Sequence, residues 1–230
     1  MIRLENYEVM GWEHAIRGMR NPKNSWEKSD SNWRYLYEEG VVDGECIGPN
    51  DHELMMKLAN AGPVHGKFRR MITVYVDITA PLYWWKEFDT YKVGTVANSC
   101  STMHKIHAQP FTRADFCYDH LEEDAPDATI ASYPNDDGGF DEWSSLGVLD
   151  LIICVLNECR YKYNTTNDKK YWWQMIQLLP SSYNQKRTVQ LNYEVLANIY
   201  EYRKNHKLDE WVQFCEWIET LPYSEIIKGE

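Results

Sequence analysis

The fold is decided by residues 179–203, which read LPSSYNQKRTVQLNYEVLANIYEYR. Pro180 ends a helix that is expected over Lys170 to Leu179, because proline lacks the backbone N–H that a helix interior needs. Further on, apolar residues recur at roughly helical spacing, at Leu191, Val195, Ile199 and Tyr202. This spacing predicts one long helical segment from Arg187 to about Trp217.

A strand precedes this region. From Met71 to Thr79 the apolar residues Ile72, Val74, Val76 and Ile78 alternate with polar or aromatic ones, which is typical of a half-buried strand. Ala80-Pro81 ends it, and an aromatic helix is expected from about Leu82 to Phe88. Two further helices are predicted, from Asp51 to Ala61 and from Trp143 to Tyr163. A helix, a strand and then helices in series indicate an α+β fold.

Residues 108–142 are predicted to be irregular. They contain an acidic stretch from Glu122 to Asp127 and a run of turn-forming residues from Pro134 to Gly139. A long loop within a compact domain often has a function, so this segment is a candidate lid or rim. No repeat and no linker divides the sequence, which predicts a single domain over residues 1–230 with an insertion at about 108–142.

The net charge of −11 limits the expected partners. Proteins that bind duplex nucleic acid usually carry the opposite charge, so no duplex partner is expected. No apolar run approaches the ~18 residues of a membrane span, and the first residues lack the apolar core of a signal peptide. These features predict a cytoplasmic protein with no membrane partner. No metal is expected, because the six cysteines form no Cys-x-x-Cys pair, and His104 and His107 lack a second ligand pair.

The opening stretch resembles the C-terminal half of flavin-dependent thymidylate synthases. In that family a Leu-Pro closes one helix, and a later helix carries residues that bind flavin and hold deoxyuridine monophosphate. Asn192, Asn198 and Arg203 stand at matching places. The resemblance extends roughly over residues 50–107 and 170–222 and implies a small antiparallel sheet with packed long helices. The chain resembles a divergent, phage-type member of the family in which the signature motif is degraded.

Two departures from the family pattern concern phosphate binding. Glu194 stands where the family has an arginine, and a carboxylate cannot hold a phosphate as a guanidinium does. Where the family has its arginine-rich signature, Ser99 to Ser101 keep serines but not the three arginines or the histidine. Each lost arginine removes a charge-assisted contact of about 1.5–3 kcal/mol. No catalytic residue is therefore assigned.

Candidate ligand-binding residues fall into two groups. At or near positions that match the family stand Asn192, Asn198, Arg203, Ser99, Ser101 and Tyr91. Cations that would replace the lost arginines are Arg69, Arg70, Lys92 and Arg187. The alternatives are ordinary ones: solvated surface charges, a helix ion pair for Arg203, a helix cap for the serines and core packing for Tyr91.

Three functions are open on this basis. The first is a nucleotide-binding protein that sequesters a nucleotide or dinucleotide without conventional methyl-transfer activity. The second is an FAD-dependent thymidylate synthase, or a related pyrimidine-nucleotide methylase, with rewired contacts. The third is a non-catalytic oligomeric interaction protein, motivated by the acidic surface and by ten Trp and sixteen Tyr. The resemblance also implies a homotetramer.

Overall fold

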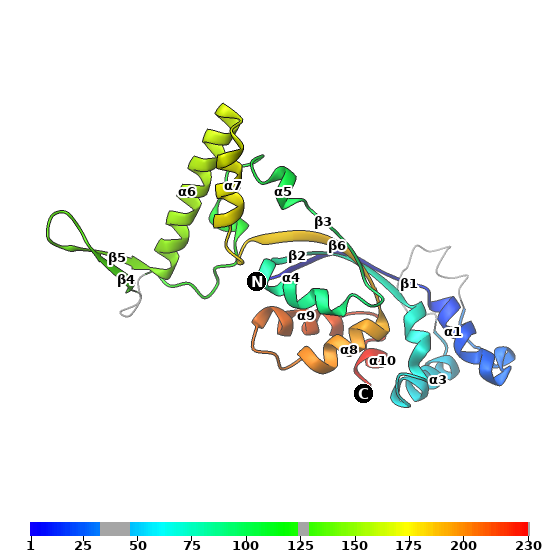
Figure 1. The fold of residues 1–230 in the computed structure, drawn as a ribbon. Coiled ribbons are helices and arrows are strands. Elements are labelled where there is room, and N and C mark those ends of the chain that lie inside the picture. The colour runs from blue at the N-terminus through cyan, green and yellow to red at the C-terminus, as the bar shows by residue number, and fades with distance from the viewer. Residues whose placement is uncertain (33–46, 124–128, 230) are drawn as a thin grey trace. The chain divides into compact units, whose positions relative to one another are not determined.

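The computed structural model describes residues 1–32, 47–123 and 129–229 (Figure 1). The chain packs into two compact units. The larger unit comprises Ile2–Thr79, Glu87–Asn98 and Arg187–Glu230, and the smaller unit comprises Met1, Ala80–Lys86 and Ser99–Lys186. No helix within the described residues is long and apolar enough to cross a lipid bilayer.

Four strands form a small sheet in the order β1-β2-β6-β3. Their bounds are Arg3–Met10 (β1), Thr73–Pro81 (β2), Asn184–Asn192 (β6) and Val96–Ser99 (β3). β1 pairs antiparallel with β2, and the register shifts between Glu5 and Glu8, where Asn6 has a φ of 52°. The predicted α+β class with a small antiparallel sheet is confirmed.

The central strand β2 forms over most of the alternating pattern, but it starts at Thr73 and includes Ala80 and Pro81, which were expected to end it. Ile72, Val74, Val76 and Ile78 are at most 1% exposed, whereas Tyr75 between them is 38% exposed. Helix α4 (Leu82–Phe88) follows directly and confirms the predicted aromatic helix. Trp84 and Trp85 within it are fully buried, and the Trp85 indole N–H donates to the Gln185 carbonyl at 2.8 Å.

The remaining helices of the larger unit supply most of its core. They are α1 (Trp12–Arg20), α3 (Pro49–Asn60), α8 (Tyr193–Arg203), α9 (Asp209–Glu219) and α10 (Glu225–Lys228), with 3-10 turns η1 (Asn21–Lys23), η2 (Trp26–Lys28), η4 (Gly66–Met71) and η5 (Asp89–Tyr91). Buried aromatic rings join the end of α4 to α9. Phe88 stacks on Trp211 at 6.4 Å and meets Phe214 edge-on at 6.2 Å.

The predicted single helix from Arg187 to Trp217 is wrong. Residues up to Asn192 belong to strand β6, and two separate helices, α8 and α9, follow. Asn192 is the physical reason, because its side-chain oxygen accepts the backbone N–H groups of Glu194 and Val195 at 3.1 Å each. This is the capping bond of a helix start, and it ends the strand. Tyr202, placed on the predicted apolar stripe, is 73% exposed.

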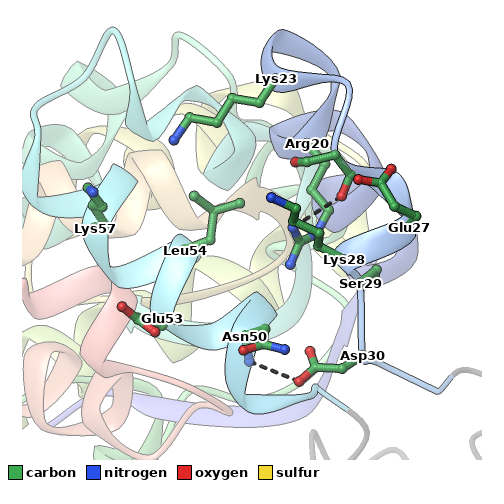
Figure 2. A pocket seen from close by; sticks show the side chains of 11 residues that line it. Arg20, Lys23, Glu27, Lys28, Ser29, Asp30, Asn50, Glu53, Leu54 and Lys57 are labelled. Carbon is green, nitrogen blue, oxygen red and sulfur yellow. Dashed lines mark hydrogen bonds between the residues drawn. The ribbon is translucent and has the colours of Figure 1, made fainter.

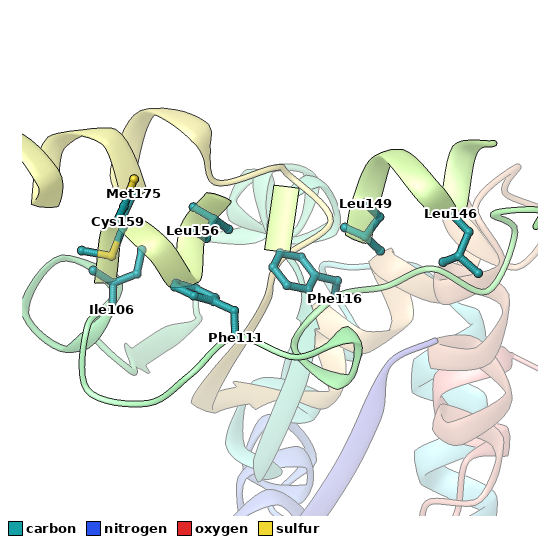
Figure 3. Close-up of a cluster of buried hydrophobic side chains, with 8 residues drawn as sticks. All are labelled: Ile106, Phe111, Phe116, Leu146, Leu149, Leu156, Cys159 and Met175. Atoms are coloured by element: carbon teal, nitrogen blue, oxygen red, sulfur yellow. The ribbon is translucent and has the colours of Figure 1, made fainter. Parts of the chain in front are cut away.

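The smaller unit is built around two helices. These are α6 (Ser145–Thr166) and α7 (Lys169–Leu178), accompanied by α5 (Thr102–Lys105) and η6 (Arg113–Asp115). Figure 3 shows its buried cluster, to which α6 and α7 contribute Leu146, Leu149, Leu156, Cys159 and Met175. Ile106, Phe111 and Phe116 complete the cluster from the preceding segment. This packing gives residues 106–116 a fixed place in the core.

The segment 108–142, predicted to be irregular, contains regular structure. Its end forms a β-hairpin of β4 (Thr129–Pro134) with β5 (Phe140–Ser144). The turn between the strands is the expected run of turn residues, and Gly138 within it has a φ of 80°. The short strands lack a clear alternation of apolar and polar residues, so the sequence pattern alone did not reveal them.

A buried ion pair joins α1 to α3. The Arg20 Nε donates to Asp51 Oδ1 at 2.6 Å, and the two side chains are 4% and 0% exposed. Asp51 Oδ2 also accepts the hydroxyl groups of Ser29 and Ser31 at 2.6 Å. Burial alone would raise the pKa of Asp51, but the hydrogen bonds from Ser29, Ser31 and Arg20 outweigh it and lower the pKa below its ordinary value.

We predict that Asp51→Asn lowers the free energy of unfolding by about 3–5 kcal/mol at pH 7, because it leaves the Arg20 charge buried and unpaired. Since the folded-state pKa of Asp51 is lowered, its contribution is present above about pH 4 and is lost as the pH falls through the folded value. Urea denaturation at pH 7 and pH 3 measures the loss of unfolding free energy and its dependence on pH. Glu53→Gln, an exposed carboxylate on the same helix, is the control. Equal unfolding midpoints for both variants at pH 7 would refute the prediction.

Candidate functional site

A pocket of about 850 Å³ opens within the larger unit. It is bounded by the end of α3 and the residues after it, by η4, by the loop at Val93 and Gly94, by one side of α8 along its length and by α10. Its charged lining residues are Arg69, Arg70, Glu194, Glu201 and Lys228. Its amide side chains are Asn60, Asn192 and Asn198.

Four of the ten candidate residues line this pocket. Arg69 and Arg70 come from η4, just before the central strand, whereas Asn192 is the N-cap of α8 and Asn198 lies in the middle of that helix. The two groups are more than 100 residues apart in sequence. The fold therefore brings the candidate cations and the family-matched asparagines to one place.

Arg69 is held by a carboxylate on the facing helix. Its Nε and one terminal nitrogen each lie 2.7 Å from Glu194 Oε2, and its other terminal nitrogen donates to the Ile226 carbonyl at 3.2 Å. The Arg69 side chain is 9% exposed and that of Glu194 is 18% exposed. Glu194, which stands where the family has an arginine, thus neutralises one of the replacement cations.

Of the two arginines that line the pocket, Arg70 is the one whose charge is available to a ligand. It is exposed, and no residue in the described part of the chain forms a hydrogen bond or ion pair with its side chain. Asn198 is also exposed, whereas Asn192 is half-buried and uses its oxygen to cap α8. Gly94, with a φ of 83°, packs close to the Asn192 amide nitrogen, since a Cβ there would come within 3.2 Å of it.

Arg203 and Tyr91 contact each other outside the pocket lining. The Arg203 Nε donates to the Tyr91 hydroxyl at 2.8 Å, and its Nη1 donates to Glu87 at 2.7 Å. The guanidinium also lies 4.7 Å from the centre of the Trp211 ring, a cation–π contact. Trp211 in turn donates its indole N–H to Glu87 at 3.1 Å. These contacts tie α8 and α9 to the end of α4 and to η5.

The other four candidates are not among the residues that line the pocket. Arg187 forms an ion pair with Asp89 at 2.8 Å, and Lys92 is exposed next to the pocket residue Val93. Ser101 caps the short helix α5 by accepting the His104 backbone N–H at 3.1 Å. Ser99 and Ser101 both belong to the smaller unit, and Ser99 is exposed at the end of β3.

A second pocket of about 600 Å³ lies near α1 and the start of α3 (Figure 2). It contains none of the ten candidates. Its buried arginine, Arg20, is committed to Asp51, and Asp30 accepts the Asn50 backbone N–H at 3.0 Å, drawn as a dashed line in Figure 2. Lysines and carboxylates alternate around its rim, so it offers a ligand less net charge than its four cations suggest.

No protein-family model and no curated protein matches the sequence. Solved structures do match. Thymidylate synthase X from Helicobacter pylori with FAD and dUMP superposes with a TM-score of 0.63 at 16% identity, covering 100% of this chain and 96% of that one. A second structure of the same enzyme with FAD and dUMP gives a TM-score of 0.59 at 15% identity, with 100% and 97% coverage.

The UMP/dUMP methylase PolB from Streptomyces cacaoi, bound to 5-Br dUMP, also matches. Its TM-score is 0.53 at 13% identity, with 96% of this chain and 88% of that one covered. The chain has a flavin-dependent thymidylate synthase-like fold. At these identities the likeness establishes the fold, and the chemistry has to be argued from this chain's own residues.

On this thymidylate synthase-like fold, sequence reasoning missed several residues that line the pocket. They are Asn60, Val93, Gly94, Glu201, Tyr202 and Lys228. Gly94 carried a local signal, because a glycine after an apolar residue often marks a turn with positive φ. The others carried none.

Among the described residues, no group of three or more His, Cys, Asp or Glu side chains is placed to hold a metal ion.

We predict that Arg203→Met lowers the free energy of unfolding by about 1–3 kcal/mol. It removes an ion pair, a hydrogen bond and a ring contact from a side chain that is 17% exposed. Arg70→Met, in contrast, is expected to change stability by less than about 0.5 kcal/mol, because Arg70 is exposed. Urea denaturation of the two variants measures this difference. If Arg203→Met is as stable as the parent protein, the structural role of Arg203 is wrong.

Proposed function

We propose that the chain binds a nucleotide on its thymidylate synthase-like scaffold and sequesters it without conventional methyl transfer. The observation that carries the proposal is the pocket at the start of α8, where the exposed Arg70 lies among polar side chains. A guanidinium is a strong phosphate ligand. Val93 and Tyr202 at the same pocket are 87% and 73% exposed, which offers an apolar and aromatic surface to a base.

The structural neighbours add support of a coarser kind. The Helicobacter pylori structures contain dUMP together with FAD, and PolB is bound to 5-Br dUMP. Both of these nucleotides are pyrimidine nucleoside monophosphates. A pyrimidine nucleotide is therefore the first ligand to test on this chain.

The lining residues do not fit the pyrophosphate of FAD. A pyrophosphate carries at least two negative charges and needs several cations or backbone donors. In this pocket Glu194 occupies Arg69, and Glu201 adds a second carboxylate. The balance of three cationic and two acidic lining side chains suits one phosphate group better than two. We therefore propose the nucleotide without the flavin.

A second candidate is an FAD-dependent thymidylate synthase or related methylase with rewired contacts. The observation in its favour is that the alignment with thymidylate synthase X covers 100% of this chain. Reconstitution separates the two candidates: the purified protein is incubated with FAD and then desalted. A stoichiometric flavin band after desalting would favour the enzyme, and its absence would favour nucleotide binding.

A third candidate is a non-catalytic oligomeric interaction protein, with the homotetramer that the family resemblance implies. Its support is a set of exposed apolar side chains on α6 and α7, namely Leu151, Val155, Tyr161, Trp173 and Leu178. Light scattering of the purified protein measures the oligomeric state. A tetramer that binds no nucleotide would favour this candidate over the first.

We predict that the protein binds UMP or dUMP and that Arg70→Ala weakens this binding by roughly 10- to 100-fold, the loss of one charge-assisted contact. Isothermal titration calorimetry measures the dissociation constants. The matched control is Arg17→Ala, because Arg17 is an exposed arginine on α1 outside the pocket lining. An equal effect of both variants would remove Arg70 from the site. No binding of either nucleotide to the parent protein would overturn the proposed function.

A further inference from the structure

We propose that Glu194 sets the specificity of the pocket: the ligand carries a single phosphate group and presents a hydroxyl or N–H donor to the free carboxylate oxygen of Glu194. The ligand class is thus a nucleoside monophosphate, and a diphosphate or dinucleotide is rejected. This inference rests on the proposed nucleotide binding. It goes further by assigning a role to the residue at which the chain departs most clearly from the enzymes it resembles.

Each nitrogen of the Arg69 guanidinium already has a partner within the chain. Two of its nitrogens lie 2.7 Å from Glu194 Oε2, and the third donates to the Ile226 carbonyl at 3.2 Å. The side chain is 9% exposed, so water screens this pair weakly. A phosphate that recruited Arg69 would have to displace a carboxylate that is already in place, and it would leave that carboxylate unpaired in the pocket wall.

Glu194 keeps one oxygen for the ligand. Both contacts from Arg69 go to Oε2, and no described residue donates to Oε1. A carboxylate oxygen accepts hydrogen bonds but cannot donate them, so it selects hydroxyl and N–H groups and repels phosphate. A ribose hydroxyl and the ring N–H of a pyrimidine both meet this requirement.

The backbone fixes the position of Glu194. Asn192 caps the helix by accepting the Glu194 and Val195 backbone N–H groups at 3.1 Å, so Glu194 lies in the first turn of α8. A negative side chain in this position is favourable toward the helix dipole. The carboxylate is therefore held by its helix as well as by Arg69, and a ligand meets it in one orientation.

The remaining charge suits one phosphate group. Arg70 is exposed at the pocket with no partner in the described residues, whereas Glu201 places another carboxylate on the same wall. Arg69 and Glu194 cancel each other. Arg70 and Lys228 then stand against Glu201, so the lining keeps one net positive charge, which is too little for a second phosphate. The pocket consequently favours UMP over UDP, although the higher charge of UDP would favour it at an ordinary cationic site.

The test compares the dissociation constants of UMP and UDP by calorimetry. For the parent protein we expect UMP to bind more tightly than UDP. Glu194→Gln frees Arg69 for phosphate and removes the repulsion, so it should shift the UDP-to-UMP preference toward UDP by roughly tenfold or more, the effect of one charge-assisted hydrogen bond. Glu201→Gln is the matched control, because it removes a carboxylate from the same pocket without touching Arg69, and should leave the preference within about threefold of the parent.

A double variant separates selectivity from folding. Arg69→Met with Glu194→Met removes both charges, so it leaves no buried unpaired charge, and its UDP-to-UMP preference should lie between that of the parent and that of Glu194→Gln, because the repulsion is gone but no arginine is freed. Thermal unfolding of each variant confirms that it is folded before the titration. If the parent binds UMP but Glu194→Gln shifts the preference no more than Glu201→Gln, the role of Glu194 is wrong while the proposed function stands. If the parent binds neither nucleotide, the proposed function itself fails.

Discussion

The pocket depends on the carboxamide of Asn192, which fixes the residue at which a strand becomes a helix. Its oxygen caps α8, and the next residue, Tyr193, is fully buried. The Tyr193 N–H donates to the Ile72 carbonyl at 3.1 Å, and its hydroxyl donates to the Pro222 carbonyl at 2.6 Å. Burial raises the pKa of Tyr193, so the phenol stays protonated and remains a donor. This junction ties the start of α8 to the central strand and to the C-terminal segment.

Three arginines of the larger unit underlie our proposal that this thymidylate synthase-like fold binds a nucleotide without conventional methyl transfer. Arg203, which matches a family position, is engaged by Glu87, Tyr91 and Trp211 and holds helices together. Arg69 stands at the pocket but is paired with Glu194. Arg70 therefore carries the phosphate-binding role in our account. A single free guanidinium matches a ligand with one phosphate group.

Local sequence patterns predicted the elements in which apolar residues recur at a single clear spacing. The strict alternation from Ile72 to Ile78 identified β2, and Ala80-Pro81 marked the start of α4. The same reasoning failed at β6, because Leu191 near the end of the strand lies four residues before Val195 and eight before Ile199 in the helix and so imitates a helical stripe. Family resemblance placed Asn192 and Asn198 at the site, but the contact between Arg69 and Glu194 joins residues 125 positions apart, and no local pattern encodes it.

The measurement that tests the central claim most directly is an absorbance spectrum of the freshly purified protein, followed by mass spectrometry of whatever heat releases from it. Our account predicts a colourless protein that releases a nucleoside monophosphate, because the pocket offers one available guanidinium beside the Arg69–Glu194 pair. A yellow protein with stoichiometric flavin bands would contradict it, and would return the chain to the flavin enzymes whose fold it shares.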